Sequence, residues 1–121
     1  VTEIGDSAFY GCSSLQSITI PEGVTEIGGG AFSGCHSLQS IVIPKGVKKI
    51  EVFAFSGCTV LTTVTLPVGV NKIADSSFYE CEALTTIYVP AKKTDYYKQR
   101  LPEKLHSLIV ELQPEKKVKK K

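Results

Sequence analysis

The chain repeats itself every 23 residues, and this periodicity constrains its fold more than any other feature of the sequence. The segment AFYGC at 8–12 returns as AFSGC at 31–35 and 54–58, and as SFYEC at 77–81. A coil this short cannot bury its own apolar side, so the pattern predicts stacked coils with one continuous core. The recurring columns are Ile4, Ile27, Ile50 and Ile73; Phe9, Phe32, Phe55 and Phe78; Leu15, Leu38, Leu61 and Leu84; and Pro21, Pro44, Pro67 and Pro90.

Each repeat contains a strand signal. In LQSITIP at 15–21, apolar and polar residues alternate. Successive side chains of a strand point to opposite faces, so Ile18 and Ile20 are expected to face inward. Ser17 and Thr19 are then expected to face outward, and the proline closes the strand because it lacks an amide proton.

Shorter signals fill the rest of the repeat. PEG after the strand predicts a turn with a positive φ at Gly23. VTEI, at 1–4 and again at 24–27, predicts a second short extended segment. GDSAF predicts a single helical turn that is capped by Asp6 or Ser7 and closed by Gly11 in the left-handed conformation.

The columns, above all LQSITIPEGVTEIGGGAFSGC at 15–35, resemble the BspA-like (Treponema-type) leucine-rich repeat. The resemblance covers residues 1–112. It implies a β-dominated α/β solenoid, curved, with a parallel sheet on its concave face and short 3-10 or helical turns elsewhere. The predicted domain contains four repeats, at 1–21, 22–44, 45–67 and 68–90, and a C-terminal cap at 91–112.

The two ends of the solenoid are expected to differ. TDYYKQRLPE at 94–103 predicts a cap helix that begins at Thr94 or Asp95 and stops before Pro102, and LHSLIV then predicts a final strand. At the other end, Val1 starts within a full-strength repeat. An apolar end with an open strand edge is therefore expected there, covered by upstream repeats or by self-association.

The net charge of +2 arises from the last residues, 113–121, which contain five of the 14 basic side chains. The remaining chain is mildly acidic, and this disfavours nucleic acid as a partner. The lysine-rich tail is predicted to be disordered, with contact to an anionic polymer, lipid or nucleic acid as the alternative. No apolar run approaches the ~20 residues of a membrane helix, so no membrane insertion is expected.

The four cysteines occupy one position of successive repeats, and three interpretations compete: disulfides, metal or thiol chemistry, and a buried column. Side chains at equivalent positions run parallel, whereas a disulfide needs Cβ atoms ~3.8 Å apart on converging vectors. Zinc sites need clustered Cys and His, and His36 and His106 are not so placed. We predict free buried thiols with no metal, cofactor or catalytic group; the column is Cys12, Cys35, Cys58 and Cys81.

The outward residues of the strands are the candidate binding site. This surface is small, hydroxylated and uncharged until it reaches Tyr88 near the cap, and an idle strand face has the same composition. One column is Ser17, Ser40, Thr63, Thr86 and Ser107; the next is Thr19, Val42, Thr65, Tyr88 and Ile109; His106 ends a third.

The family resemblance implies adhesion and protein binding by exported or surface-attached proteins, and it brings no catalytic residues. We therefore expect a non-catalytic module that binds a protein or a surface glycan through its concave strand face, at the cell surface or outside the cell. The alternatives are a structural spacer that holds another domain away from a surface, or binding by the tail to an anionic polymer or nucleic acid.

Overall fold

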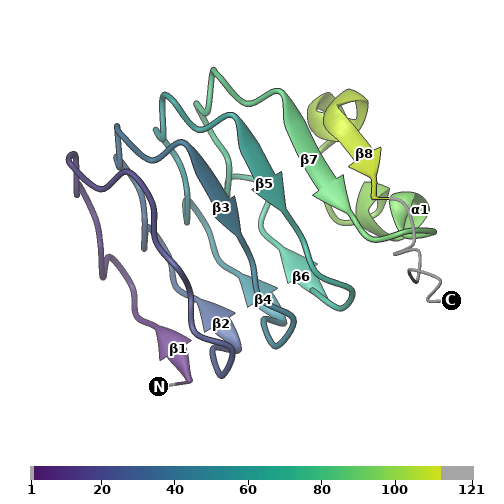
Figure 1. Ribbon diagram of the computed structural model, residues 1–121, viewed down its shortest axis with the longest axis horizontal. Coiled ribbons are helices and arrows are strands. Elements are labelled where there is room, and N and C mark those ends of the chain that lie inside the picture. The colour runs from purple at the N-terminus through teal and green to yellow at the C-terminus, as the bar shows by residue number, and fades with distance from the viewer. Residues whose placement is uncertain (1, 113–121) are drawn as a thin grey trace, which may run out of the picture.

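The computed structural model describes residues 2–112, which form stacked coils closed by a C-terminal cap. Figure 1 shows the successive coils side by side, from the purple N-terminal coil to the green and yellow cap. The predicted solenoid is confirmed, because the strands form parallel sheets and helix is confined to short segments. The predicted disordered tail, 113–121, lies outside the described residues.

Two parallel sheets run along the solenoid, and in each of them strands of successive coils pair side by side. The second extended segment of each repeat, VTEI at 1–4 and 24–27 and its later counterparts, was expected only as a short piece, but these segments form a sheet of their own. That sheet contains β1 (Glu3–Ile4), β2 (Glu26–Ile27), β4 (Lys49–Ile50) and β6 (Lys72–Ile73). The other contains β3 (Ser40–Val42), β5 (Thr63–Thr65), β7 (Thr86–Val89) and β8 (Ile109–Glu111).

The strand expected at 15–21 does not form, although its residues match those of β3. The backbone there has no regular secondary structure, and the N–H of Gln39 donates to the carbonyl oxygen of Gln16 at 3.4 Å. Ile18 is half-buried, whereas its counterpart Ile41 is buried on β3. The first coil therefore follows the predicted path without completing the ladder.

The segment between the two strands consists of successive hydrogen-bonded turns rather than a helical turn. Gly11, Gly34 and Gly57 have φ values of 70°, 75° and 70°, so the expected left-handed closure is confirmed. The expected helix cap is wrong. The Asp6 carboxylate instead accepts a hydrogen bond from the N–H of Gly29 in the next coil, at 2.8 Å.

The proline turn is present, but its glycine has a different role from the one expected. The N–H of Val47 donates to the carbonyl oxygen of Pro44 at 3.2 Å, and φ at Gly23 is not positive. A Cβ on the equivalent Gly46 would lie 2.9 Å from the carbonyl oxygen of Glu22. Glycine is needed here because adjacent coils approach closely.

The core is a set of columns that run the length of the stack. The rings of Phe9, Phe32, Phe55 and Phe78 lie parallel to within 5°, with centroids 5.2, 5.2 and 5.4 Å apart. Isoleucines of the short strands pair in register beside them, and those of β2 and β4 are fully buried. Each coil thus covers the apolar side of its neighbour.

The cap contains α1 (Thr94–Lys98), the 3-10 helix η1 (Glu103–Leu108) and β8. The predicted helix is present, but Lys93 is its N-cap and makes no side-chain capping bond. Thr94 instead donates through Oγ1 to Glu111 at 2.8 Å. η1 occupies most of the predicted final strand, so the strand begins at Ile109.

Candidate functional site

The outward residues of β3, β5 and β7 form continuous columns, because these strands pair in register. Ser40 lies beside Thr63, and Thr63 lies beside Thr86. In the second column Val42 lies beside Thr65, and Thr65 beside Tyr88. The sequence therefore predicted correctly that these six side chains line one face.

The last member of the second column is Val110 rather than Ile109. β7 pairs with β8 so that Tyr88 lies opposite Val110 and Ile87 opposite Ile109. Ile109 therefore continues the inward column and packs against the core. Val110 is 45% exposed, and the prediction missed it because it assumed a spacing of 21 residues from Tyr88, whereas the structure has 22.

His106 and Ser107 do not belong to the strand face either, because both lie in η1. The Nε2 of His106 is 3.0 Å from the carbonyl oxygen of Leu101 within the cap. This contact holds the ring against its own segment. The predicted place of His106 in the third column is wrong.

The two outward columns do not continue as paired strands into the first coil. Ser17 and Thr19 are exposed as expected, but they belong to the segment that does not pair as a strand. A hollow of about 330 Å³ lies between this segment and β3. Its lining includes Ser17, Thr19, Ser40 and Val42, so the structure brings these four predicted residues to one concavity.

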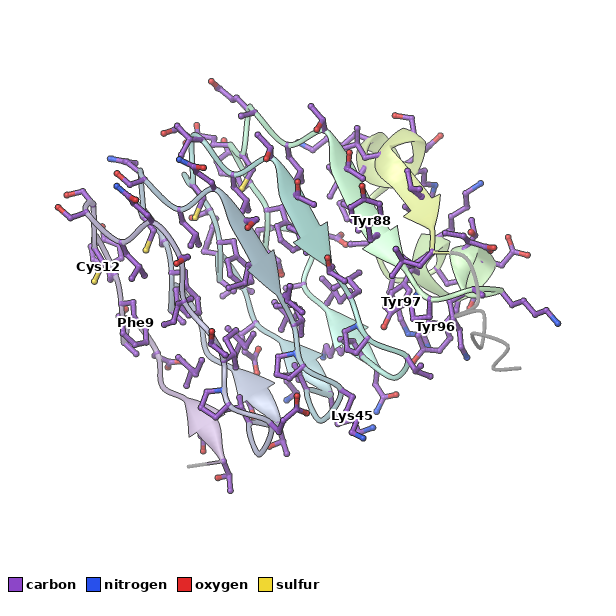
Figure 2. All side chains as sticks on the ribbon, in the orientation of Figure 1. Phe9, Cys12, Lys45, Tyr88, Tyr96 and Tyr97 are labelled. Atoms are coloured by element: carbon purple, nitrogen blue, oxygen red, sulfur yellow. The ribbon has the colours of Figure 1, made fainter. Side chains whose placement is uncertain are left out.

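We use "outer strip" for Val42, Thr65, Tyr88 and Val110. Adjacent strands lie about 4.8 Å apart, so the outer strip spans about 14 Å. Val42 is 63% exposed, and Figure 2 shows Tyr88 on β7. Two exposed valines thus lie at the ends of a row that also contains an aromatic ring.

The column beside these residues has a structural role. The hydroxyl of Thr62 donates to the carbonyl oxygen of Gln39 at 3.2 Å, and that of Thr85 to the carbonyl of Thr62 at 3.3 Å. These hydroxyls connect successive coils through hydrogen bonds to the backbone. The hydroxyls of Thr63 and Thr86 in the first column lie 3.3 and 3.4 Å from those of Thr62 and Thr85, so the two columns are connected.

The cysteines are free and form the predicted column. The thiol of each later cysteine donates to the carbonyl oxygen of a phenylalanine in the preceding coil, from Cys35 to Phe9 and from Cys58 to Phe32. Burial raises the pKa of Cys35 to about 11, and the pKa of Cys58 is raised by its hydrogen bond with Cys81 and by burial. At neutral pH both are thiols, which are poor nucleophiles.

Metal ligands do not cluster in the described part of the chain, where no three His, Cys, Asp or Glu side chains lie close enough to hold an ion. His36, which follows Cys35, is exposed. Over the same residues, no helix has the length and apolar character of a membrane span.

The face of the short strands is charged, and its sign changes along the solenoid. Glu3 lies beside Glu26, Glu26 beside Lys49, and Lys49 beside Lys72. The pKa of Glu26 is raised, first by its hydrogen bond with Glu51 and then by partial desolvation. Lys49 in turn lies 3.4 Å from Glu51. The charge of this face therefore changes from acidic to basic along the solenoid, on a solvated surface.

Sequence reasoning missed an exposed aromatic pair on the turn segments. Phe53 is 47% exposed, and its ring meets that of Tyr79 edge-on at a centroid distance of 6.2 Å. Phe53 has a φ of 57°, where the preceding coil places Gly30. A bulky residue is strained in that conformation. No alternation or column in the sequence marks such a position.

Comparison with known families identifies the repeat. The family model described as BspA type leucine-rich repeat region (6 copies) matches residues 1–101. No curated protein matches the chain in sequence.

Two solved structures are similar over most of the chain. A leucine-rich repeat protein from Bacteroides ovatus ATCC 8483 is 30% identical, with a TM-score of 0.76 over 93% of this chain. A leucine-rich repeat protein of T. pallidum is 36% identical, with a TM-score of 0.71 over 88%. The chain spans 28% and 53% of these two proteins.

Proposed function

Since the chain belongs to the BspA-type leucine-rich repeat family, we propose that it is a non-catalytic binding module that holds a protein or glycan on the outer strip. The family supports a repeat-based module for protein interaction or for structure. The finer assignment, adhesion to a partner at the cell surface or outside the cell, is our proposal. The family resemblance supports that location.

The observation that carries the proposal is the composition of the outer strip. Val42 and Val110 are 63% and 45% exposed, and Tyr88 lies between them in the same column. Covering an exposed apolar side chain with a partner removes apolar surface from water, and this contributes favourably to the free energy of binding. Aromatic residues are also over-represented among the residues that contribute most to binding.

The backbone beneath the outer strip is held by strand pairing and a buried core, and this favours binding further. Each strand is fixed by ladder hydrogen bonds to the strands beside it, and its inward residues Ile41, Val64 and Ile87 are at most 2% exposed. A surface that is ordered before contact loses little conformational entropy on association. The hollow beside Ser17 and Val42 adds a concave end to this surface.

A non-catalytic role agrees with the chemistry of the described residues. The candidate nucleophiles are the cysteines, and two of them, Cys35 and Cys58, are fully buried with raised pKa values. The hydroxyl column on the strands lacks the adjacent base and orienting acid that an activated nucleophile needs. Recognition is therefore the activity that this surface supports best.

The test is a binding screen on an array of extracellular matrix proteins and bacterial surface glycans. The intact chain is compared with Tyr88→Ala and with Tyr10→Ala, a matched control because Tyr10 is 67% exposed on the first turn segment. We expect Tyr88→Ala to weaken capture at least tenfold and Tyr10→Ala to leave it unchanged. Equal loss in both variants, or none, contradicts the proposal.

A screen without any hit favours the structural spacer. Truncation after Leu112 completes the experiment, because it removes the lysine-rich tail while keeping all the described residues. Capture that disappears with the tail and falls steeply with salt assigns binding to the tail.

A further inference from the structure

Three cations gather where the basic half of the short-strand sheet meets the cap. Lys93 and Arg100 both lie over the ring of Tyr96, with Nζ 4.8 Å and Cζ 3.6 Å from its centroid. The Nε of Arg100 donates to the carbonyl oxygen of Asn71 at 3.0 Å, and Lys72 follows Asn71 at the start of β6. Figure 2 shows Tyr96 at this end of the stack. We use "cap cations" for Lys72, Lys93 and Arg100.

The guanidinium of Arg100 is held in one orientation. Besides the bond from Nε, Nη1 donates to the carbonyl oxygen of Tyr96 at 2.8 Å, and the group stacks on the Tyr96 ring. Among residues 2–112, these bonds leave the two N–H groups of Nη2 without a protein acceptor. A guanidinium presents its donors as a planar fork that matches the oxygens of an anionic group. Arg100 therefore offers oriented donors to an oxyanion.

The cap cations also lack the carboxylate partner that neutralises the preceding coil. On β4, Lys49 lies 3.4 Å from Glu51, and this is the only ion pair in the described part of the chain. Asp95 of α1 is exposed and makes no ion pair with the cap cations. The positive potential of this face is consequently concentrated at the cap, where it attracts anions.

The surroundings of the cap cations favour an anionic ligand that needs no apolar anchor. Ammonium and guanidinium groups supply only charge and hydrogen-bond donors. The outward residues of the four short strands are all charged, and they are Glu3, Glu26, Lys49 and Lys72. This sheet face thus lacks the aromatic anchors that contribute most to protein interfaces. A polysaccharide with sulfate or carboxylate groups suits such a surface, because it binds through oxyanions and hydroxyls.

We propose that the cap cations bind the oxyanion groups of an acidic polysaccharide. Arg100 holds one sulfate or carboxylate group by hydrogen bonds, and Lys72 and Lys93 contribute charge. The acidic residues Glu3 and Glu26 at the other end of the same sheet repel the polymer, so it is confined to the cap end. The site is separate from the outer strip, which lies on the other sheet, and the inference does not depend on the function proposed for that strip.

The experiment measures the affinity of the full chain for four immobilised polymers. Dextran sulfate and polygalacturonate present sulfate and carboxylate groups on a polysaccharide. Neutral dextran removes the charge, and polyglutamate presents carboxylates on a peptide. The lysine-rich tail is identical in every variant, so differences between variants report on the described residues alone.

Two double variants remove the same charge from different places. Lys72→Gln with Arg100→Gln changes two cap cations. Lys45→Gln with Lys104→Gln is the matched control, because both lysines are exposed, one on the turn between β3 and β4 and the other on η1. Figure 2 shows Lys45 on an earlier coil than Tyr96. Circular dichroism verifies that the variants are folded.

Two single variants keep the test independent of the structural contacts of Arg100. Lys72→Gln changes an exposed side chain and leaves the bonds of Arg100 in place. Arg100→Lys keeps the charge but loses the planar fork. We expect each of them to weaken binding to the acidic polysaccharides at least threefold, since hydrogen bonds between charged groups contribute more than neutral ones.

We expect the intact chain to bind an acidic polysaccharide but not neutral dextran. The double change of cap cations should weaken this binding at least tenfold, and the control pair should leave it unchanged. Equal weakening by both pairs overturns the proposal, because net charge then accounts for the binding. Failure to bind either acidic polysaccharide, or unchanged affinity without the cap cations, also overturns it. Equally tight binding to polyglutamate, lost with the same residues, assigns the site to an acidic peptide and contradicts the proposed ligand.

Discussion

The thiol of Cys58 donates a hydrogen bond to the carbonyl oxygen of Phe32 in the preceding coil, at a sulfur–oxygen distance of 3.2 Å. Cys81 makes the same contact with Phe55 at 3.0 Å. Cysteine thus joins the turn segments of successive coils while it fills a small apolar position. This double role explains why the residue recurs in every repeat without forming a disulfide.

Replacement of Cys58 by alanine should lower the free energy of unfolding by about 1–2 kcal/mol, because it removes a buried sulfur and a hydrogen bond. Urea denaturation measures the loss. Cys12→Ala is the control and should cost less, since Cys12 is only partly buried in the terminal coil. Equal losses at the two positions would contradict the proposed role of burial.

Stability should fall as the pH rises from about 9 to about 11. Burial raises the pKa of Cys35 from 9.0 to about 11, so the folded state retains a proton that the unfolded state loses. Below pH 9 both states are protonated and this group has no effect; above it, deprotonation favours the unfolded chain. Thermal unfolding across this range tests the expectation, and Cys35→Ala should reduce the slope.

Phe55→Ala should cost about 3–5 kcal/mol, because the ring is fully buried and stacks on both Phe32 and Phe78. The control is Phe53→Gly, two residues away, where the side chain is half-exposed and φ is 57°. Glycine removes the strain there, so its net effect should stay within about 1 kcal/mol. A larger effect at Phe53 than at Phe55 would contradict the continuous phenylalanine column.

Tyr97→Phe should destabilise the cap by about 1–3 kcal/mol, because it leaves the buried N–H of Val70 without its hydrogen-bond acceptor. Tyr96→Phe is the matched control, and it should cost less because the Tyr96 hydroxyl accepts no hydrogen bond from a buried N–H; it donates to the carbonyl oxygen of Val70 at 2.9 Å, with Oδ1 of Asn71 at 3.4 Å. Urea denaturation followed by circular dichroism compares the two. Similar values would show that the buried N–H does not account for the effect.

The sequence predicted the interior of the solenoid well because each column is repeated four times. Ile41, Val64 and Ile87 are all buried on paired strands, as their alternation indicates. The same repetition placed Tyr88 on the outward face. Positions that depend on a neighbouring coil were harder to predict, and the segment at 15–21 is an example. Its residues match those of β3, but its coil is covered on one side only.

The cap was predicted less well because its period differs. Tyr88 and Val110 are 22 residues apart, whereas the predicted column from Tyr88 to Ile109 assumed a spacing of 21 residues. The alternation in KLHSLIV also suits a strand, yet η1 occupies Glu103–Leu108 and buries Leu105. A short apolar alternation does not distinguish these two structures. Ile109 and His106 were misplaced for this reason.

The most direct test of the account is the affinity of Val42→Lys for the target that the array identifies, measured against Val68→Lys. The two valines are 63% and 56% exposed, but only Val42 belongs to the outer strip. If the outer strip binds the partner, Val42→Lys weakens affinity at least tenfold and Val68→Lys does not. If Val42→Lys binds as tightly as the unmodified chain, the outer strip is not the binding surface.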